Sequence, residues 1–410
     1  MSSNVMGSDR RPVLVVTPEF KADAPRRLAE LRARGPIHRV RGGSGLDLWM
    51  VVSYSEARAA LTHPALLKDP SPAEEALREV NYTGHKPTVG IGGNMLTSDP
   101  PDHTRLRRLV AGAFTPRHVQ GLAPRIQQIA DDLLDAMARQ REVDLVEAYT
   151  APLPLTVICE MLGVPQGERR NFRAWTRALL GSSSDTQRAG ARNLSEYLAD
   201  LIERKRAEST DDLLSALITV HSAEDGRLSR TELISTGLLL VVGGHDTTVN
   251  LLGNAMLALL QRPDQADLLR ARPELIGGAV EEFLRYDAPL EQTTLRYAAE
   301  DLELGGRQIL RGDVVMVMLA SASRDAPQPD GDDPDVLDVA RANARHLAFG
   351  HGIHHCLGAP LARMEAVIGI SSLLRRFSDL RPVMPLEEVP RISVGPVRGP
   401  RSLLVRLGDG

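Results

Sequence analysis

Hydrophobic residues recur every three or four positions over most of the chain, which is the pattern of amphipathic α-helices. The longest such stretch covers residues 229–261, and both of its ends carry boundary signals. Ser229 and Glu232 have capping-box spacing at its start, and Arg262-Pro263 ends it. The same periodicity predicts shorter helical stretches at residues 116–137, 148–162 and 189–206.

A smaller part of the chain alternates apolar and polar residues, which favours β-strands. Residues 36–54 alternate on both sides of a Gly-Gly-Ser-Gly turn and are predicted to form a hairpin. Residues 294–319 are predicted to form further strands around a turn at Gly305-Gly306, and residues 402–407 a last short strand. The pattern therefore predicts a mainly helical protein with a small β-rich region.

Residues 80–97 contain four glycines and a proline without clear periodicity, so they are predicted to form a long irregular loop. Long loops in compact domains are uncommon and often functional. No spacer rich in serine and glycine, low-complexity tract or repeat divides the 410 residues. Residues 1–410 are therefore expected to form a single domain.

The composition is that of a globular protein with a large aliphatic core, because 42% of residues are hydrophobic and only 3% are aromatic. The formal net charge of −4 argues against nucleic acid or an anionic membrane as the main partner. The longest apolar run, residues 237–244, is too short to span a membrane, so no membrane anchor is expected. Two distant cysteines make no disulfide framework, which fits a reducing cytoplasm, and Cys159 is expected to be a buried apolar residue.

Unusual chemistry is concentrated in residues 349–358, FGHGIHHCLG. A thiolate at Cys356 is a strong, soft ligand, and glycines let a backbone approach a flat, bulky group. A haem iron would suit this cysteine, since an axial thiolate favours cleavage of the O–O bond. Two other interpretations stay open from these residues alone. One is a zinc site formed by His351, His354, His355 and Cys356, and the other is an inert, buried cysteine.

The middle of the 229–261 helix contains GGHDTT, residues 243–248, which is poor helix-forming sequence. Each glycine costs about 1 kcal/mol relative to alanine in a helix. The threonine hydroxyls can donate to backbone carbonyls one turn back, which would open a small polar notch. A helix crossing, at which the glycines let another backbone come close, is the simpler alternative.

Two pairs of charged or basic residues have helical spacing. Residues 98–110 carry hydroxyl and acidic caps followed by prolines suited to a first turn, which predicts a helix with His103 and Arg107 on one face. Glu282 and Arg285 also share a face of a predicted helix. From spacing alone, a solvated basic helix and an exposed salt bridge are the ordinary interpretations.

The FGHGIHHCLG segment resembles the haem-binding signature of the cytochrome P450 superfamily. That signature is a phenylalanine, two glycines, a basic residue, the cysteine and a following glycine in this order, and APLARME is a typical start of the next helix. In this chain the signature residues are Phe349, Gly350, Gly352, His354, Cys356 and Gly358.

The resemblance covers nearly the whole chain and implies a mainly α P450 fold with a small β-rich region. It places haem b between the long central helix and residues 349–358, the cysteine loop. Cys356 would be the iron ligand, and Phe349 would pack beside Cys356. His103 and Arg107 match the family's propionate-binding pair. Arg296 matches a propionate-binding arginine on the opposite side, and His354 would be a further donor.

The resemblance also gives the GGHDTT segment a role on the oxygen-binding side of the haem. Thr247 matches the family's catalytic hydroxyl there, and Asp246 the acid that relays protons inward. Gly243 stands where alanine is more common.

The family buries the Glu282-Arg285 pair under the haem and usually adds a third partner. Val336 occupies the position of that partner, an arginine in most members, which leaves open whether Arg341 replaces it.

The implied activity is that of a haem-thiolate monooxygenase that hydroxylates or epoxidises a lipophilic compound with O2. Electrons are expected from NAD(P)H through a ferredoxin reductase and a ferredoxin, which would dock on a basic patch including Arg363. The segments DPPDHTRLRR, VEEFLRY and HLAFGHGIHHCLG resemble actinomycete enzymes that tailor macrolides and other polyketides. A terpenoid, steroid or other small lipophile is the alternative substrate, and a non-catalytic haem-binding protein the alternative function. We expect a cytoplasmic monomer whose pocket involves Val241, Val242 and residues 80–97, 181–184, 290–294 and about 394.

Overall fold

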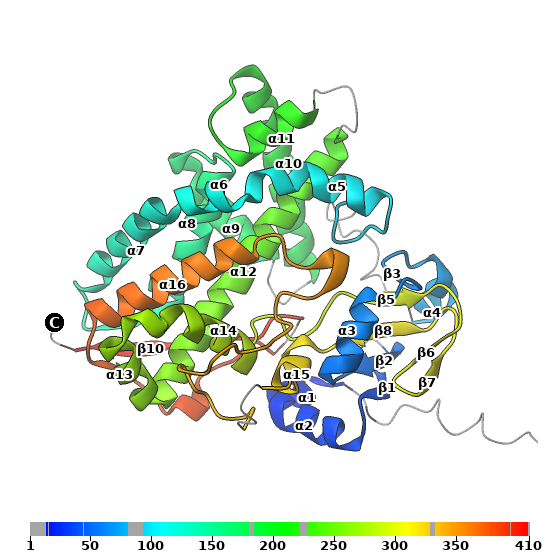
Figure 1. Ribbon diagram of the computed structural model, residues 1–410. Helices are drawn as coiled ribbons and strands as arrows, with labels where there is room; N and C mark the ends of the chain where they lie inside the picture. The colour runs from blue at the N-terminus through cyan, green and yellow to red at the C-terminus, as the bar shows by residue number, and fades with distance from the viewer. Residues whose placement is uncertain are drawn as a thin grey trace, which may run out of the picture.

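The computed structural model describes residues 14, 16–43, 45–80, 93–179, 184–221, 228–328, 333–393 and 395–408. A large helical part and a smaller part rich in β-strands lie side by side (Figure 1). The mainly α fold with a small β region is thus confirmed.

Helix α12 (Arg230–Gln261) runs through the helical part, and most of its residues are buried. The Ser229 side chain accepts a hydrogen bond from the Glu232 amide, and Glu232 reaches back to the Ser229 amide, so the predicted capping box is confirmed. Helices packed against α12 include α8 (Pro152–Met161), α10 (Ser184–Ala207), α14 (Ile276–Tyr286) and α16 (Ala359–Arg376).

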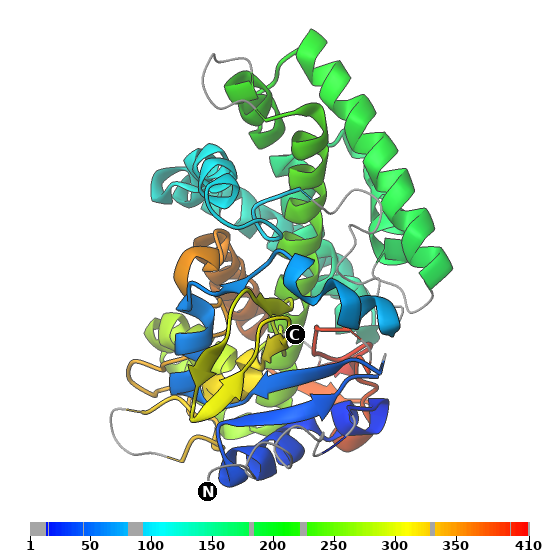
Figure 2. The same ribbon diagram turned by 90° about the vertical axis from the view of Figure 1, so that its right-hand side faces the viewer.

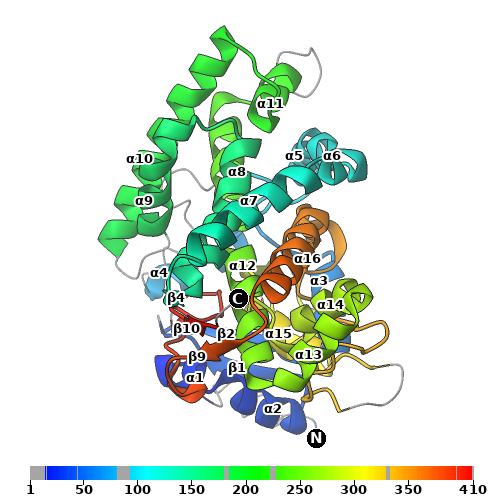
Figure 3. The ribbon, with the colours of Figure 1, turned by 90° about the vertical axis from the view of Figure 1, so that its left-hand side faces the viewer.

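The other helices of this part are α5 (Asp102–Ala111), α6 (Pro116–Gly121), α7 (Ala123–Met137), α9 (Arg169–Leu179), α11 (Leu213–His221) and α13 (Pro263–Ala271). In the view of Figure 3, α7 and α16 lie side by side beside α12.

Two predicted helix boundaries were wrong. Residues 116–137 form two helices, since α6 ends at Gly121 and Pro124 lies in the first turn of α7. Helix α5 begins at Asp102 rather than near residue 98, and Pro100 and Pro101 precede it. The side chains of Ser98 and Asp99 bind other partners instead of capping the helix.

The strands form three sheets, and both predicted hairpins are confirmed. The largest sheet has the order β1-β2-β8-β5-β3 and joins strands from both halves of the sequence, as Figure 2 shows by their blue and yellow colours. Its strands are β1 (Ile37–Arg41), β2 (Asp47–Val51), β3 (Leu66–Leu67), β5 (Arg296–Ala298) and β8 (Val314–Val317). The smaller sheets pair β6 (Leu302–Leu304) with β7 (Arg307–Ile309), and β10 (Leu404–Leu407) with β4 (Glu142–Asp144) and β9 (Leu380–Pro382).

Short helices accompany the strands of the largest sheet. They are α1 (Pro18–Ala22), α2 (Ala24–Arg34), α3 (Tyr54–Thr62), α4 (Glu74–Glu79) and α15 (Leu319–Arg324). The last of these begins where the predicted strand region 294–319 ends.

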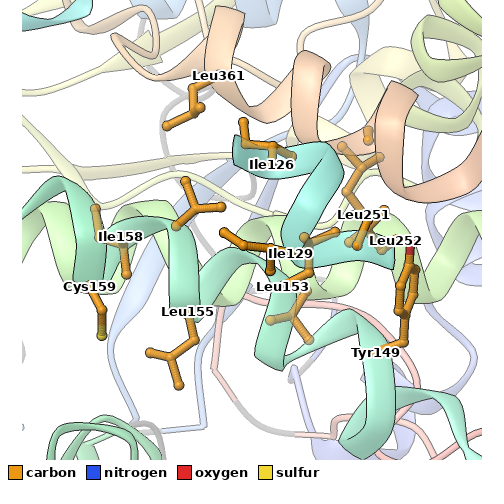
Figure 4. Close-up of a cluster of buried hydrophobic side chains, with 14 of the residues drawn as sticks. Ile126, Ile129, Tyr149, Leu153, Leu155, Ile158, Cys159, Leu251, Leu252 and Leu361 are labelled. Atoms are coloured by element: carbon orange, nitrogen blue, oxygen red, sulfur yellow. The ribbon is translucent and has the colours of Figure 1, made fainter. Parts of the chain in front are cut away.

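An aliphatic core holds the helices together. Side chains of α7, α8, α12 and α16 meet in one cluster, and those drawn in Figure 4 include Ile126, Leu153, Leu252 and Leu361. Cys159 belongs to this cluster and is 1% exposed, which confirms that it is a buried apolar residue. Within the described ranges, no helix is both long and apolar enough to cross a membrane.

A buried ionic network fixes the segment that leads to residues 349–358. The Arg285 Nε and Nη2 atoms donate to the Glu282 carboxylate at 2.6 and 2.8 Å, and both side chains are fully buried. Arg341 Nε lies 3.3 Å from the same carboxylate. Arg341 therefore supplies the third partner, and Val336 contributes only its backbone carbonyl to the two arginines.

Candidate functional site

The loop around Cys356 is held in shape by its glycines. Gly350 and Gly352 have φ angles of +72° and +73°, which residues with a Cβ rarely adopt. The Cys356 amide donates to the Phe349 carbonyl at 2.8 Å, closing the loop just before α16. A Cβ at Gly352 would come within 3.0 Å of the Leu61 carbonyl oxygen, so the loop also needs glycine to lie against α3.

Cys356 is an exposed residue whose thiol is nevertheless closely surrounded by protein. The residue is exposed in the bare chain, yet neighbouring protein desolvates the thiol, and this is the main cause that raises its pKa. The backbone amides of Gly358 and Ala359, with the charges of Arg107 and Arg363, act in the opposite direction. These groups would stabilise a thiolate that coordinates a metal.

Phe349 is the first residue of the cysteine loop, and its ring packs against an ion pair. The Arg363 guanidinium is 4.5 Å from the centre of the Phe349 ring. Its Nε and Nη2 atoms donate to the two carboxylate oxygens of Glu281 at 2.7 and 2.8 Å. Glu281 therefore offsets the charge of Arg363, whose side chain is still 38% exposed, and its part in a docking patch stays a prediction.

Three of the predicted propionate ligands gather at the start of α5 and the end of the cysteine loop. The rings of His103 and His354 meet with centroids 4.5 Å apart, and Arg107 Nη2 donates to the His355 carbonyl at 2.7 Å. Burial, followed by the charges of Lys68, Arg296, His103 and Arg107, lowers the pKa of His354 to about 3.

Arg296, the fourth predicted propionate ligand, adjoins the same cluster from β5. Its guanidinium is buried, and Nη1 donates to the Leu66 carbonyl at 3.0 Å. Burial lowers its pKa to about 10. The adjacent Lys68 is also buried and was missed in the sequence, where a single lysine after a short apolar run carries no distinguishing signal.

The four predicted propionate ligands, His103, Arg107, Arg296 and His354, fit a haem with its two propionates. Both ring nitrogens of His103, Nε of Arg296 and Nε2 of His354 are buried without a well-formed hydrogen bond. Buried polar groups in folded proteins are rarely left unpaired, and carboxylates are strong acceptors for such donors.

In the part of the chain that the structure describes, no cluster of three or more His, Cys, Asp or Glu could hold a metal, which contradicts the zinc alternative.

The GGHDTT segment of α12 keeps a helical backbone and forms the predicted threonine contacts. Thr247 Oγ1 donates to the Gly243 carbonyl at 2.6 Å, and Thr248 Oγ1 to the Gly244 carbonyl at 3.3 Å. A Cβ at Gly243 would meet no atom within 4 Å, and one at Gly244 would make only an ordinary contact with Ile158 at 3.5 Å. A close helix crossing therefore does not explain the two glycines.

Asp246 is half-buried in the same turn of α12. Burial raises the pKa of its carboxyl group to about 6. Asn250 Nδ2 donates to the Asp246 backbone carbonyl at 2.7 Å. Among the described residues, neither Asp246 nor Thr247 forms a hydrogen bond with the cysteine loop, so no direct bond joins the two groups of predicted site residues.

Part of the predicted substrate pocket lies outside the described residues, namely 81–92, 180–183 and 394. In the described part, Val241 is buried and Val242 partly buried on α12, and Leu290 forms an isolated β-bridge with Val397.

Comparison with known proteins agrees with this geometry. The cytochrome P450 family model matches residues 158–395. The cytochrome P450 monooxygenase PikC of Streptomyces venezuelae is 45% identical over 96% of this chain and 93% of its own length. The 6-deoxyerythronolide B hydroxylase of Saccharopolyspora erythraea is 43% identical over 88% of this chain and 90% of its own.

A solved structure has the same fold. The tirandamycin C-bound P450 monooxygenase TamI superposes with a TM-score of 0.87 and 43% identity, covering 96% of this chain and all of TamI. The family model, the two relatives and the solved structure each match more than half of this chain. The chain therefore belongs to the cytochrome P450 family of haem-thiolate monooxygenases.

Proposed function

We propose that this P450 hydroxylates or epoxidises a polyketide, with macrolactones as the first class of substrate to test. One relative is named as a hydroxylase of 6-deoxyerythronolide B, a macrolactone, and the structure of TamI contains tirandamycin C. Both relatives align with this chain over most of its length. The sequence motifs point to the same class of enzyme.

The observation that carries the catalytic part of the proposal is the exposed Cys356, which follows His354 by two residues, together with the buried nitrogen atoms of His103, Arg296 and His354 that lack a well-formed hydrogen bond. Cys356 would bind the haem iron, and His103, Arg107, Arg296 and His354 would bind the propionates. When bound, a thiolate-ligated haem supplies the reduction of O2 and the transfer of one oxygen atom to substrate.

The GGHDTT segment of α12 would supply protons on the oxygen-binding side of the haem. The Thr247 hydroxyl donates to Gly243, so its oxygen is oriented with lone pairs free to accept a hydrogen bond. Asp246, with a pKa of about 6, can both hold and release a proton near neutral pH. We assign proton delivery to Asp246. Thr247 would form a hydrogen bond, through its oriented hydroxyl, at the end of the proton path.

Electrons would come from NAD(P)H through a ferredoxin reductase and an acidic ferredoxin. A surface pocket of about 260 Å³ on the cysteine-loop side is lined by Arg345, His346, Phe349, His355 and Arg363, among other residues. We propose that the ferredoxin docks over this pocket. Arg345 would be its ionic contact, because Glu281 already binds Arg363.

A binding screen tests the proposed substrate class. Macrolactones, other polyketides, terpenoids and steroids are added to the oxidised holoprotein, and to free haemin as the background. We expect saturable absorption changes with at least one polyketide, followed by substrate-dependent NAD(P)H consumption with ferredoxin and reductase present. Binding of terpenoids or steroids alone would reject the polyketide assignment, and binding without turnover would favour a non-catalytic haem protein.

Replacing Thr247 with alanine tests its assigned role. We expect Thr247→Ala to retain haem and substrate binding while a larger share of the electrons appears as hydrogen peroxide instead of product. The removed hydroxyl is the group that Gly243 orients. Product and peroxide formed per NAD(P)H are measured.

Thr247→Ser is the matched control, because it keeps the hydroxyl, and it should stay close to the wild type. With a substrate that does not itself supply a hydroxyl, the same ratio of product to peroxide in Thr247→Ala and the wild type would refute the role.

A further inference from the structure

Lys68 lies opposite Arg296 across two paired strands. Strands β3 and β5 are antiparallel, with Leu66 opposite Ala298 and Leu67 opposite Tyr297. One residue further, the same register sets Lys68 opposite Arg296. Directly opposed residues lie on the same face of a sheet, so the two cationic side chains extend toward the same region.

Both cations are buried, which is costly without an anion. Lys68 is 8% exposed and Arg296 is 4% exposed. Like charges that face each other across strands destabilise a sheet, and a buried charge without an anionic partner is strongly destabilising. Burial and the charge of Arg296 lower the pKa of Lys68 to about 7, against the opposing effect of Asp99.

The protein supplies mainly neutral partners to the Lys68 ammonium. Its Nζ atom donates to the Thr294 hydroxyl at 2.5 Å and to the carbonyls of Thr294 and Leu295, each at 3.3 Å. The Asp99 carboxylate accepts the backbone amides of Lys68 and Asp69, at 2.8 and 2.9 Å, rather than the ammonium. Among the described residues, no carboxylate forms an ion pair with Lys68.

We infer that Lys68 is a further haem-binding residue, whose ammonium acts with Arg296 to neutralise a propionate of the cofactor. The inference rests on the proposed haem site and extends it by a residue from β3. Its position suits the role, because Lys68 faces Arg296 across the paired strands β3 and β5, and its charge also contributes to the lowered pKa of His354. A haem carboxylate would supply the anion that the two buried cations lack.

The alternative is that Lys68 only anchors the backbone at residues 294–295, and a pair of variants separates the two roles. Lys68→Met removes the charge, whereas Thr294→Val removes the hydroxyl that holds the ammonium and keeps the charge. Haem release from the oxidised holoprotein into excess apomyoglobin is measured for both, together with the reduction potential of the haem.

We expect Lys68→Met to release haem about tenfold faster, the effect of losing one hydrogen bond to a charged group. Its reduction potential should fall, because a nearby positive charge favours the reduced iron. Lys68→Arg should restore both properties, and Thr294→Val should remain within about twofold of the wild type.

Wild-type values in Lys68→Met, or equal changes in Lys68→Met and Thr294→Val, would overturn the inference. If Lys68→Met does not fold, Lys68→Gln provides the same comparison. Failure of the haem site itself is recognised separately, because the wild type would then lack a thiolate-type carbon monoxide spectrum.

Discussion

Replacing Glu282 with alanine should lower the free energy of unfolding by about 3–5 kcal/mol, the cost of breaking a buried ion pair. The Glu282 carboxylate is fully buried and binds Arg285 and Arg341. It also accepts the Asp338 amide at 3.0 Å, which ties the segment before the cysteine loop to α14. Removing it leaves two buried guanidinium groups without their anion. Urea unfolding of the holoprotein, followed by far-ultraviolet circular dichroism, measures the loss.

The control is an acid of the same type in an exposed pair. Glu74 lies 2.8 Å from Arg78 in α4, and its side chain is 65% exposed. Glu74→Ala should change the free energy of unfolding by less than about 0.5 kcal/mol. A loss below about 1 kcal/mol in Glu282→Ala would contradict the structural role assigned to the network.

Replacing Cys356 with histidine should abolish monooxygenase activity even where haem still binds. Oxygen activation in this family depends on electron donation from a thiolate, which an imidazole does not supply. The loop is also arranged for sulfur, since the Gly358 and Ala359 amides and the Arg107 and Arg363 charges favour a thiolate. Product formation with ferredoxin, reductase and a substrate from the binding screen is the measurement.

Cys159→Ala is the matched control for this substitution. Cys159 is buried in α8, and burial raises the pKa of its thiol to about 12, so it is unsuited to bind iron. The control variant should keep the wild-type turnover per bound haem. Sustained product formation by Cys356→His would show that another residue supports the chemistry.

The sequence pattern predicted well those elements that depend only on residues close together in the chain. The capping box at Ser229 and the hairpin across residues 36–54 depend on neighbouring residues, and both are confirmed. The division of residues 116–137 was missed although Pro124 was visible, because a proline near a helix start also fits a continuous stretch that begins earlier.

Contacts between distant segments could not be predicted in the same way. Neither the pairing of Lys68 with Arg296 nor that of Glu281 with Arg363 has a spacing signal, because each depends on strand register or helix packing. The open question at Val336 was likewise answered only by the fold, which brings Arg341 to Glu282.

The site residues were found through the family motifs. The structure brings His103, Arg107, Arg296 and His354 together, while their function, like that of Asp246, Thr247 and Cys356, remains a prediction. A single domain, a monomeric state and a cytoplasmic location also remain predictions from the sequence.

Binding of the haem iron by the sulfur of Cys356 is tested most directly by one spectrum. The protein is produced with ample haem precursor, reduced and exposed to carbon monoxide. We predict the absorption band characteristic of a thiolate ligand in the wild type and in Cys159→Ala. A colourless protein, or a band typical of a nitrogen ligand alone, would contradict it.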